Sequence, residues 1–235
     1  MASAVGVDGC PGGWIAVTAE YDAASARPQG AKAGFFARLG NLLAAHDDAM
    51  IVIDMPIGLV AGREERGADR PTRALLGPRR SSVFTPPCRA ALQAPDYPAA
   101  NAAQRRYAGR GLSKQAWMLA LKLREVDGVM TPAMQDRVRE GHPELAFARA
   151  AGGPMAHPKR SMHGLFARIR LLAAFGYDPI ALSAGLPPEV DAAPDDLVDA
   201  CILAHVAARC GYGEALCVPE APAKDPRGLR MEIWS

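Results

Sequence analysis

The 235-residue sequence lacks several features that would assign it to a familiar class. No apolar run approaches the roughly 20 residues that a membrane-spanning helix needs, which argues against an integral membrane protein. The N-terminus has no basic region followed by an apolar stretch and a cleavage site, so no secretion signal is expected. The five cysteines show no C-x-x-C spacing, which is typical of reduced thiols. We therefore expect a cytoplasmic protein without a membrane partner.

Lysine is absent from one long segment, and the charge of that segment is one-sided. Residues 61–110 contain ten arginines, no lysine and four acidic residues, which is a net charge of +6. Because the whole chain carries +2, the remainder carries −4. A basic segment beside an acidic remainder indicates an anionic partner. A solvated arginine-rich loop would have the same composition.

Two apolar runs each end in an aspartate that precedes a Gly/Pro turn. The first runs to Asp8, and the turn that follows leads into the apolar run at 14–17, which predicts a hairpin. The second covers 50–53 and ends at Asp54, where Pro56 prevents its continuation. If the two strands are neighbours, their aspartates meet at one edge of the sheet. Turn or helix capping is the alternative role for both residues.

The rest of the chain predicts an α/β fold in a single domain, 1–235. The segment at about 60–112 contains six prolines and little periodicity, so we expect an insertion that carries function or forms a mobile lid. The apolar patterns elsewhere predict a weak strand, four helices and three further strands. These expected elements are the strand 31–36, the helices 35–46, 112–126, 161–175 and 195–209, and the strands 137–142, 216–218 and 229–234.

The helix expected at 195–209 carries two acids that a cap does not fully explain. Asp196 and Asp199 are three residues apart and therefore share a face, and Asp199 lies beside the buried side. Together with Asp8 and Asp54 they form a set of four carboxylates on separate elements. Hard divalent cations such as Mg²⁺ or Mn²⁺ take oxygen ligands, and two such ions can align a water and stabilise a leaving oxygen. The set therefore predicts a two-metal site for phosphodiester cleavage.

Other side chains are candidates for binding phosphate or moving a proton. His142 and Glu144 follow the strand expected at 137–142 and are candidates for proton transfer, although a lone histidine is more often structural. Guanidinium groups and hydroxyls suit phosphate oxygens, although a structural salt-bridge loop has the same residues. The residues expected to bind substrate are Arg79, Arg80, Ser81, Ser82, Lys114 and Lys159.

Seven stretches resemble motifs of the predicted nuclease family catalogued as domain of unknown function 429. The resemblance covers nearly the whole chain in order. It implies a ribonuclease H-like fold, with a five-stranded mixed sheet of three antiparallel and two parallel strands flanked by helices. It also implies a metal-dependent nuclease of the Holliday-junction-resolvase branch, whose metal-binding acids correspond to Asp8, Asp54, Asp196 and Asp199. The stretches are 5–14, 53–59, 79–84, 111–115, 125–127, 140–144 and 195–200.

Three functions remain open at this point. The first is a Mg²⁺- or Mn²⁺-dependent nuclease that acts on DNA or RNA, either as a monomer or as a homodimer. The second is a phosphotransferase or ATPase of the actin and sugar-kinase type, because an Asp-Gly pair before a glycine-rich hairpin also binds phosphate there. The third is a catalytically inactive nucleic-acid-binding domain that uses only its basic segment.

Overall fold

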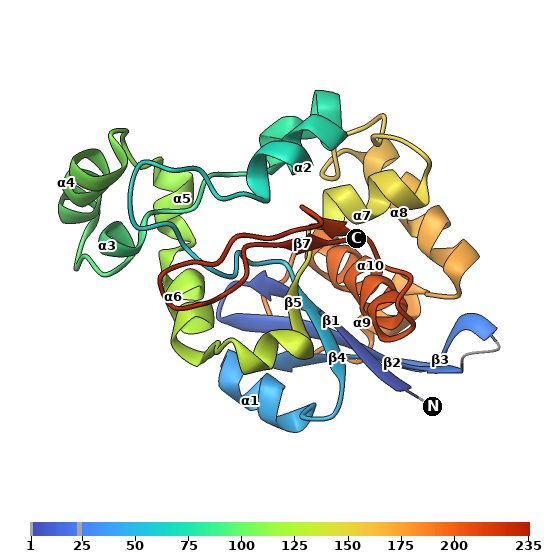
Figure 1. The fold of residues 1–235 in the computed structure, drawn as a ribbon. Coiled ribbons are helices and arrows are strands. Elements are labelled where there is room, and N and C mark those ends of the chain that lie inside the picture. The colour runs from blue at the N-terminus through green and yellow to red at the C-terminus, as the bar shows by residue number, and fades with distance from the viewer. Residues whose placement is uncertain (1, 23–24) are drawn as a thin grey trace.

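A five-stranded mixed sheet forms the centre of the computed structural model, which describes residues 2–22 and 25–235 (Figure 1). The strand order is β3-β2-β1-β4-β5, with β1, β2 and β3 antiparallel and with β4 and β5 parallel to β1. This confirms the predicted α/β class and the three-plus-two arrangement. The strands are β1 (Ala2–Cys10), β2 (Gly13–Asp22), β3 (Ser25–Phe36), β4 (Met50–Ile53) and β5 (Val138–Glu140).

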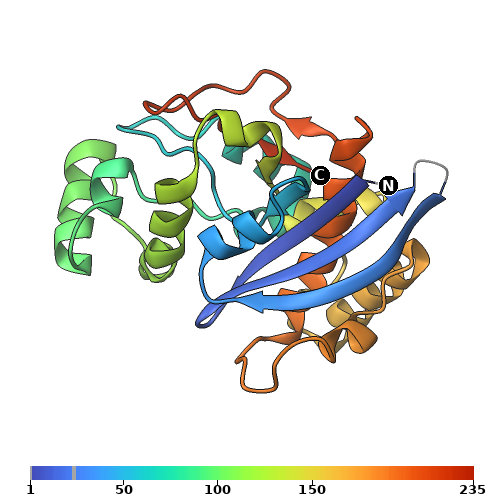
Figure 2. The same ribbon diagram turned by 90° about the horizontal axis from the view of Figure 1, so that it is seen from below.

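Helices cover both faces of this sheet. The longest, α10, packs against β1, β2 and β4, whereas α1 and α6 contribute to the core on the opposite face. Figure 2 shows the three long antiparallel strands running side by side. The helices are α1 (Leu39–Ala45), α2 (Asp69–Leu76), α3 (Arg89–Leu92), α4 (Tyr97–Ala108), α5 (Lys114–Met118), α6 (Ala120–Val129), α7 (Pro143–Ala150), α8 (Met162–Phe175), α9 (Pro179–Ser183) and α10 (Pro194–Gly211).

Short elements complete the described chain. The 3₁₀ turns η1 (Gly77–Ser82) and η2 (Ala133–Asp136) follow α2 and α6, and β6 (Cys217–Val218) pairs with β7 (Ile233–Trp234) in a small second sheet. None of the helices described between residues 2 and 235 is long and apolar enough to cross a membrane.

The central strands are apolar throughout because both of their faces are buried. Val5 and Val7 of β1 lie in the same core cluster as Ile51 and Ile53 of β4, on the face covered by α1 and α6. The residues between them face α10. Because both faces of the sheet are buried, successive side chains point to opposite faces but the sequence does not alternate between apolar and polar residues. The short run at 50–53 therefore needs no polar position until the strand ends at Asp54.

Gly6 sets how closely α10 approaches the sheet. A Cβ atom at this position would lie 2.1 Å from both the Ala200 carbonyl oxygen and the Ala204 backbone nitrogen. Any side chain would therefore push the helix away from β1. Because side chains alternate along a strand, residues 6 and 8 share a face, and the close contact brings Asp8 beside the first half of α10.

The main difference from the sequence-based expectations is that several proline-containing segments form helices. The segment expected as an irregular insertion at 60–112 contains α2, η1, α3 and α4, and α7 follows β5 where no helix was predicted. Prolines stand in the first turn of η1, α4 and α7, where the missing N–H costs nothing. These prolines begin helices, whereas the sequence analysis took the prolines of 60–112 only as interruptions of regular secondary structure.

The remaining differences concern element bounds. The helix expected at 112–126 is two helices, α5 and α6, separated at Leu119, and the strand expected at 31–36 is the end of the longer β3. The strand expected at 229–234 is reduced to β7, with one isolated bridge at Arg230.

Candidate metal centre

Three carboxylates converge at the carboxyl ends of β1 and β4. Asp8 lies near the end of β1, Asp54 directly follows β4, and Asp199 lies in the second turn of α10. Each offers an oxygen that lies within 4.8 Å of the oxygens from the other two. The parallel pairing of Val7 with Ile53 puts the first two side by side, and the Asp54 backbone N–H donates to the Val7 carbonyl at 2.9 Å. The structure thus brings together acids that are far apart in the sequence.

Hydrogen bonds leave part of this acidic site without a partner from the protein. The Asp8 Oδ1 atom accepts a hydrogen bond from the Gly9 backbone N–H at 2.7 Å. The Lys159 Nζ atom lies 2.5 Å from Asp199 Oδ2 and 3.2 Å from Asp195 Oδ2. The other oxygen of Asp199, Oδ1, is buried without a hydrogen-bond partner among the described residues. An orphaned buried carboxylate oxygen and three hard oxygen donors fit a divalent cation.

The electrostatics of the site favour the addition of positive charge. Burial raises the pKa of Asp8 well above its ordinary value, and the nearby Asp54 and Asp199 raise it further. Burial also raises the pKa of Asp54 to about 6 and that of Asp199 to about 7, although Lys159 opposes both shifts. Burial acts to lower the pKa of Lys159, but Asp199, Asp8 and Asp54 outweigh it and the pKa is raised. One ammonium group faces two buried acids, Asp8 and Asp199, and the half-buried Asp54, which leaves negative charge for a cation to neutralise.

The other two acids at the start of α10 have separate roles. The Asp196 Oδ2 atom accepts a hydrogen bond from the Ala193 backbone N–H at 2.9 Å, which closes the first turn of the helix. It is not part of the carboxylate cluster that the structure forms among its described residues. Asp195 is buried and faces Lys159 and Arg160. Of the late acids that the sequence left open, Asp199 is the one whose oxygens join Asp8 and Asp54.

His142 and Glu144 hold helices together and do not join the acidic site. The His142 Nδ1 atom accepts the Leu145 backbone N–H at 3.3 Å and caps α7, and burial lowers the pKa of the imidazole. The buried Glu144 carboxylate pairs with the Arg168 guanidinium of α8 at 2.7 Å. These partners give both residues a structural role, although the Glu144 Oε1 atom is buried without a hydrogen bond among the described residues, and proton transfer by either residue stays a prediction.

The candidate phosphate-binding residues divide into tethered and free groups. Arg79 donates to the Met155 and Ala156 carbonyls at 2.9 and 2.7 Å, which fastens η1 to the loop that carries Lys159. The Ser82 hydroxyl donates to the Arg79 carbonyl at 2.9 Å. The side chains left exposed, and without an ion pair among the described residues, are Arg80, Ser81 and Lys114.

A buried ionic network near Asp54 was not predicted from the sequence. Arg66 donates to Asp69 at 2.9 Å and pairs with Glu140 of β5, whose other contact is the Ile57 backbone N–H at 2.7 Å. The Arg66 guanidinium also donates to the Gly58 carbonyl at 2.9 Å. The network therefore holds the loop that begins at Asp54. Its members are separated by up to 74 residues, so no local pattern connects them.

The comparisons with known proteins identify a family for this chain. The family model described as "Protein of unknown function (DUF429)" matches residues 6–224, which include all three acids of the site. No curated protein and no solved structure matches the chain at a significant level.

Proposed function

This chain belongs to the family described as protein of unknown function DUF429, and from that premise and its acidic site we propose that it is a metal-dependent nuclease. One observation carries the proposal: Asp8, Asp54 and Asp199 come from three elements and their oxygens lie within 4.8 Å of one another. Gathering three carboxylates, two of them buried and one half-buried, costs free energy unless cations compensate them. A structural role alone does not explain why the fold accepts that cost.

The residues of the chain divide the chemical work between them. Bound Mg²⁺ or Mn²⁺ would activate a water and stabilise the leaving oxygen of a phosphodiester. Asp8, Asp54 and Asp199 would hold the ions, and whether one or two are held depends on how many substrate oxygens complete the shell. Lys159 neutralises part of Asp199 in the free protein, and its ammonium would turn to a phosphate oxygen when substrate binds.

The substrate would be held along the basic insertion. Phosphate contacts by Lys and Arg position a nucleic acid without reading its sequence, and their affinity falls as salt rises. In Figure 1 the helices α3, α4 and α5 extend away from the sheet, so their exposed cations can follow a backbone beyond the acidic site. The exposed cations of this region are Arg63, Arg70, Arg80, Arg105, Arg106, Arg110 and Lys114.

A second function is favoured by the position of Lys159. Its Nζ atom lies 2.5 Å from Asp199 and provides a built-in cation, as expected of a domain that binds nucleic acid but has no metal. The two functions differ in one measurable property, because only the nuclease requires a divalent ion. No contact in the described residues specifically favours a phosphotransferase.

The test is cleavage of labelled single- and double-stranded DNA and RNA with Mg²⁺, with Mn²⁺ and with a chelator. We expect cleavage with either metal ion, loss of cleavage with chelator, and loss of cleavage in Asp8→Asn and Asp199→Asn. The matched control is Asp47→Asn, a carboxylate that is exposed in the loop after α1 and should leave the rate unchanged. Full activity of Asp8→Asn would refute the nuclease, and nucleic-acid binding without any Mn²⁺ binding by calorimetry would favour the inactive binding domain.

A further inference from the structure

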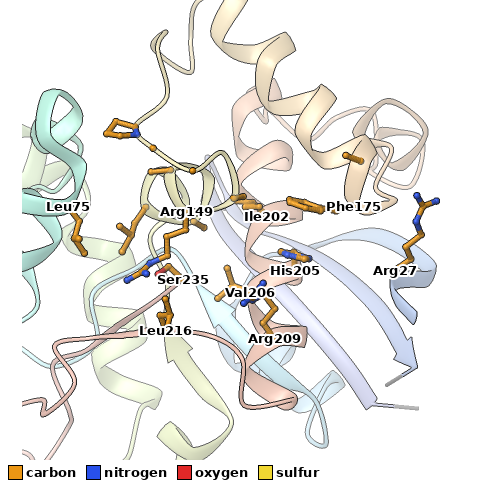
Figure 3. Close-up of a pocket in the computed structure, with 18 residues that line it drawn as sticks. Arg27, Leu75, Arg149, Phe175, Ile202, His205, Val206, Arg209, Leu216 and Ser235 are labelled. Atoms are coloured by element: carbon orange, nitrogen blue, oxygen red, sulfur yellow. The ribbon is translucent and has the colours of Figure 1, made fainter. Parts of the chain in front are cut away.

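A cavity of about 780 Å³ opens between α7, α8 and α10 (Figure 3), and none of the three acids of the acidic site lines it. Its walls are mostly apolar, and Leu145, Ile202, Val206 and Leu216 are among the side chains that line it. Pockets for small organic ligands typically measure about 300–1,000 Å³ and combine apolar walls with a few polar groups. The size and the walls of this cavity are thus those of a ligand site.

Arginines from three elements line this cavity, which we call the basic cavity. Arg149 belongs to α7, Arg209 to α10 and Arg27 to β3. None of the three has an ion pair among the described residues. The Arg149 Nε atom is buried without a hydrogen-bond partner. Burial and the charge of Arg209 both lower the pKa of the Arg149 guanidinium. The Arg209 Nη2 atom donates to the Glu214 carbonyl at 3.0 Å, but no ion pair among the described residues compensates the charge of Arg209 or Arg149. Two partly desolvated cations without a counter-ion are costly unless an anion joins them.

Two further polar atoms on the wall of the cavity also lack partners. The His205 Nδ1 atom and the Ser235 hydroxyl oxygen are buried without a hydrogen bond to the described residues. The His205 ring stacks on Phe175, with ring centroids 4.3 Å apart and an angle of 3° between the planes. Buried polar atoms are rarely left unpaired in a folded protein. Three such atoms around one cavity indicate groups that pair with something other than the protein.

We propose that the basic cavity binds a small organic oxyanion, a carboxylate or phosphate joined to a flat apolar body. The forked guanidinium groups of Arg149 and Arg209 match the geometry of an oxyanion. The flat body would lie among the apolar side chains, next to the stacked pair of His205 and Phe175. The His205 Nδ1 atom and the Ser235 hydroxyl would each gain the hydrogen bond that they now lack.

This site is separate from the acidic site, although both use α10. Ile202 of the cavity wall lies only three residues from Asp199, but the polar groups of the cavity on α10 begin at His205, which is six residues or roughly 9 Å along the helix axis from Asp199. The two regions also have opposite charge, so neither ligand competes for the other's contacts. The proposal therefore does not depend on nuclease activity.

A matched pair of fluorescent probes tests the proposal on the full chain. Anilinonaphthalene sulfonate carries an oxyanion on a flat aromatic body, and phenylnaphthylamine has nearly the same body without the charge. We expect the sulfonate to bind at one site and more tightly than the neutral probe. Raising the salt from about 0.05 to about 0.5 M should weaken only the sulfonate, since salt screens the arginines. Equal affinity for the two probes at low salt would overturn the proposal.

Variants locate the binding site in the cavity. Arg149→Gln and Arg209→Gln should each weaken sulfonate binding about tenfold or more, because each removes a charge-assisted hydrogen bond. The control Arg170→Gln alters an exposed arginine of α8 and should change nothing. Ala150→Trp keeps every charge but fills the cavity, and it should block both probes. Unfolding curves establish that each variant is folded, and unchanged sulfonate affinity in folded Arg209→Gln or Ala150→Trp would overturn the proposal.

Discussion

The acidic site and the basic cavity both use α10, yet the charges of the two regions have different partners. At the acidic site three carboxylates gather within 4.8 Å, and Lys159 compensates part of their charge. In the basic cavity Arg149 and Arg209 have no acidic partner among the described residues. One region keeps an internal counter-ion in place, and the other does not.

The difference indicates how each region accepts its ligand. A cation that enters the acidic site must compete with the Lys159 ammonium and with protons held at raised pKa values. An anion that enters the basic cavity meets no ion pair of Arg149 or Arg209 among the described residues that it would have to break. We therefore expect the affinity of the acidic site for metal to be conditional on pH and on substrate, and that of the basic cavity to depend mainly on salt.

The largest effect on stability is expected at the close contact between Gly6 and α10, because α10 contributes residues to both the acidic site and the basic cavity. Gly6→Ala places a Cβ atom 2.1 Å from backbone atoms of Ala200 and Ala204, so the helix must shift. We expect a loss of about 3 kcal/mol or more in the free energy of unfolding, measured in urea. The control Gly40→Ala lies in α1 with no atom within 4 Å of its Cβ, and should stabilise by about 0.5–1 kcal/mol. Wild-type stability of Gly6→Ala would show that the close contact is not required.

The next effect separates two acids of α10 that look alike in the sequence. Asp199→Asn replaces a charged carboxylate of the cluster with a neutral amide, and Mn²⁺ binding measured by calorimetry should weaken about 100-fold or more. Asp196→Asn changes only the helix-capping carboxylate and should leave Mn²⁺ affinity within about threefold, with a stability loss below about 1 kcal/mol. Equal losses of affinity in the two variants would place Asp196 in the metal shell.

A pH effect is expected at the basic cavity, where burial and Arg209 lower the pKa of His205 to about 4. Since the unfolded value is about 6.5, the unfolded chain takes up a proton first as the pH falls. Stability should therefore drop between about pH 6.5 and 4, by about 2 kcal/mol. His205→Gln should flatten this part of the urea-unfolding profile, whereas His163→Gln, which alters an exposed ring, should not. The same slope in wild type and His205→Gln would contradict the assignment.

The smallest effect concerns the cost of the clustered acids. Without metal, Asp8→Asn should raise the free energy of unfolding by about 1 kcal/mol, because it removes a carboxylate beside two others. The folded pKa of Asp8 is raised, so the wild type loses stability as the pH rises above the unfolded value of about 4. The advantage of the variant should therefore grow with pH. Saturating Mn²⁺ should reverse the order of stability, and a variant less stable than wild type without metal would contradict the idea.

Local sequence patterns were sufficient to predict where the strands before Asp8 and Asp54 end. The apolar runs before Asp8 and Asp54, each stopped by Gly or Pro, predicted two strands ending at the same edge, and their pairing through Val7 and Ile53 has that form. The prolines of 60–112 were misread, because a proline that ends one element and a proline that begins a helix look the same without the capping residue. Asp96, which caps α4, was the available signal.

Contacts between distant segments lay beyond the reach of those patterns. The pairing of Arg66 with Glu140 and that of Lys159 with Asp199 join residues that are 74 and 40 positions apart. The basic cavity was missed altogether, because Arg149 and Arg209 are ordinary helix residues until α7 and α10 are packed together. The sequence by itself determined where the strands before Asp8 and Asp54 end and which acids follow them, since both depend on local polarity and turn chemistry, whereas the arrangement of the sheet was expected only from the family resemblance. Only the tertiary structure decided which charges are buried, which have partners and which do not, because burial and pairing depend on neighbours from remote segments.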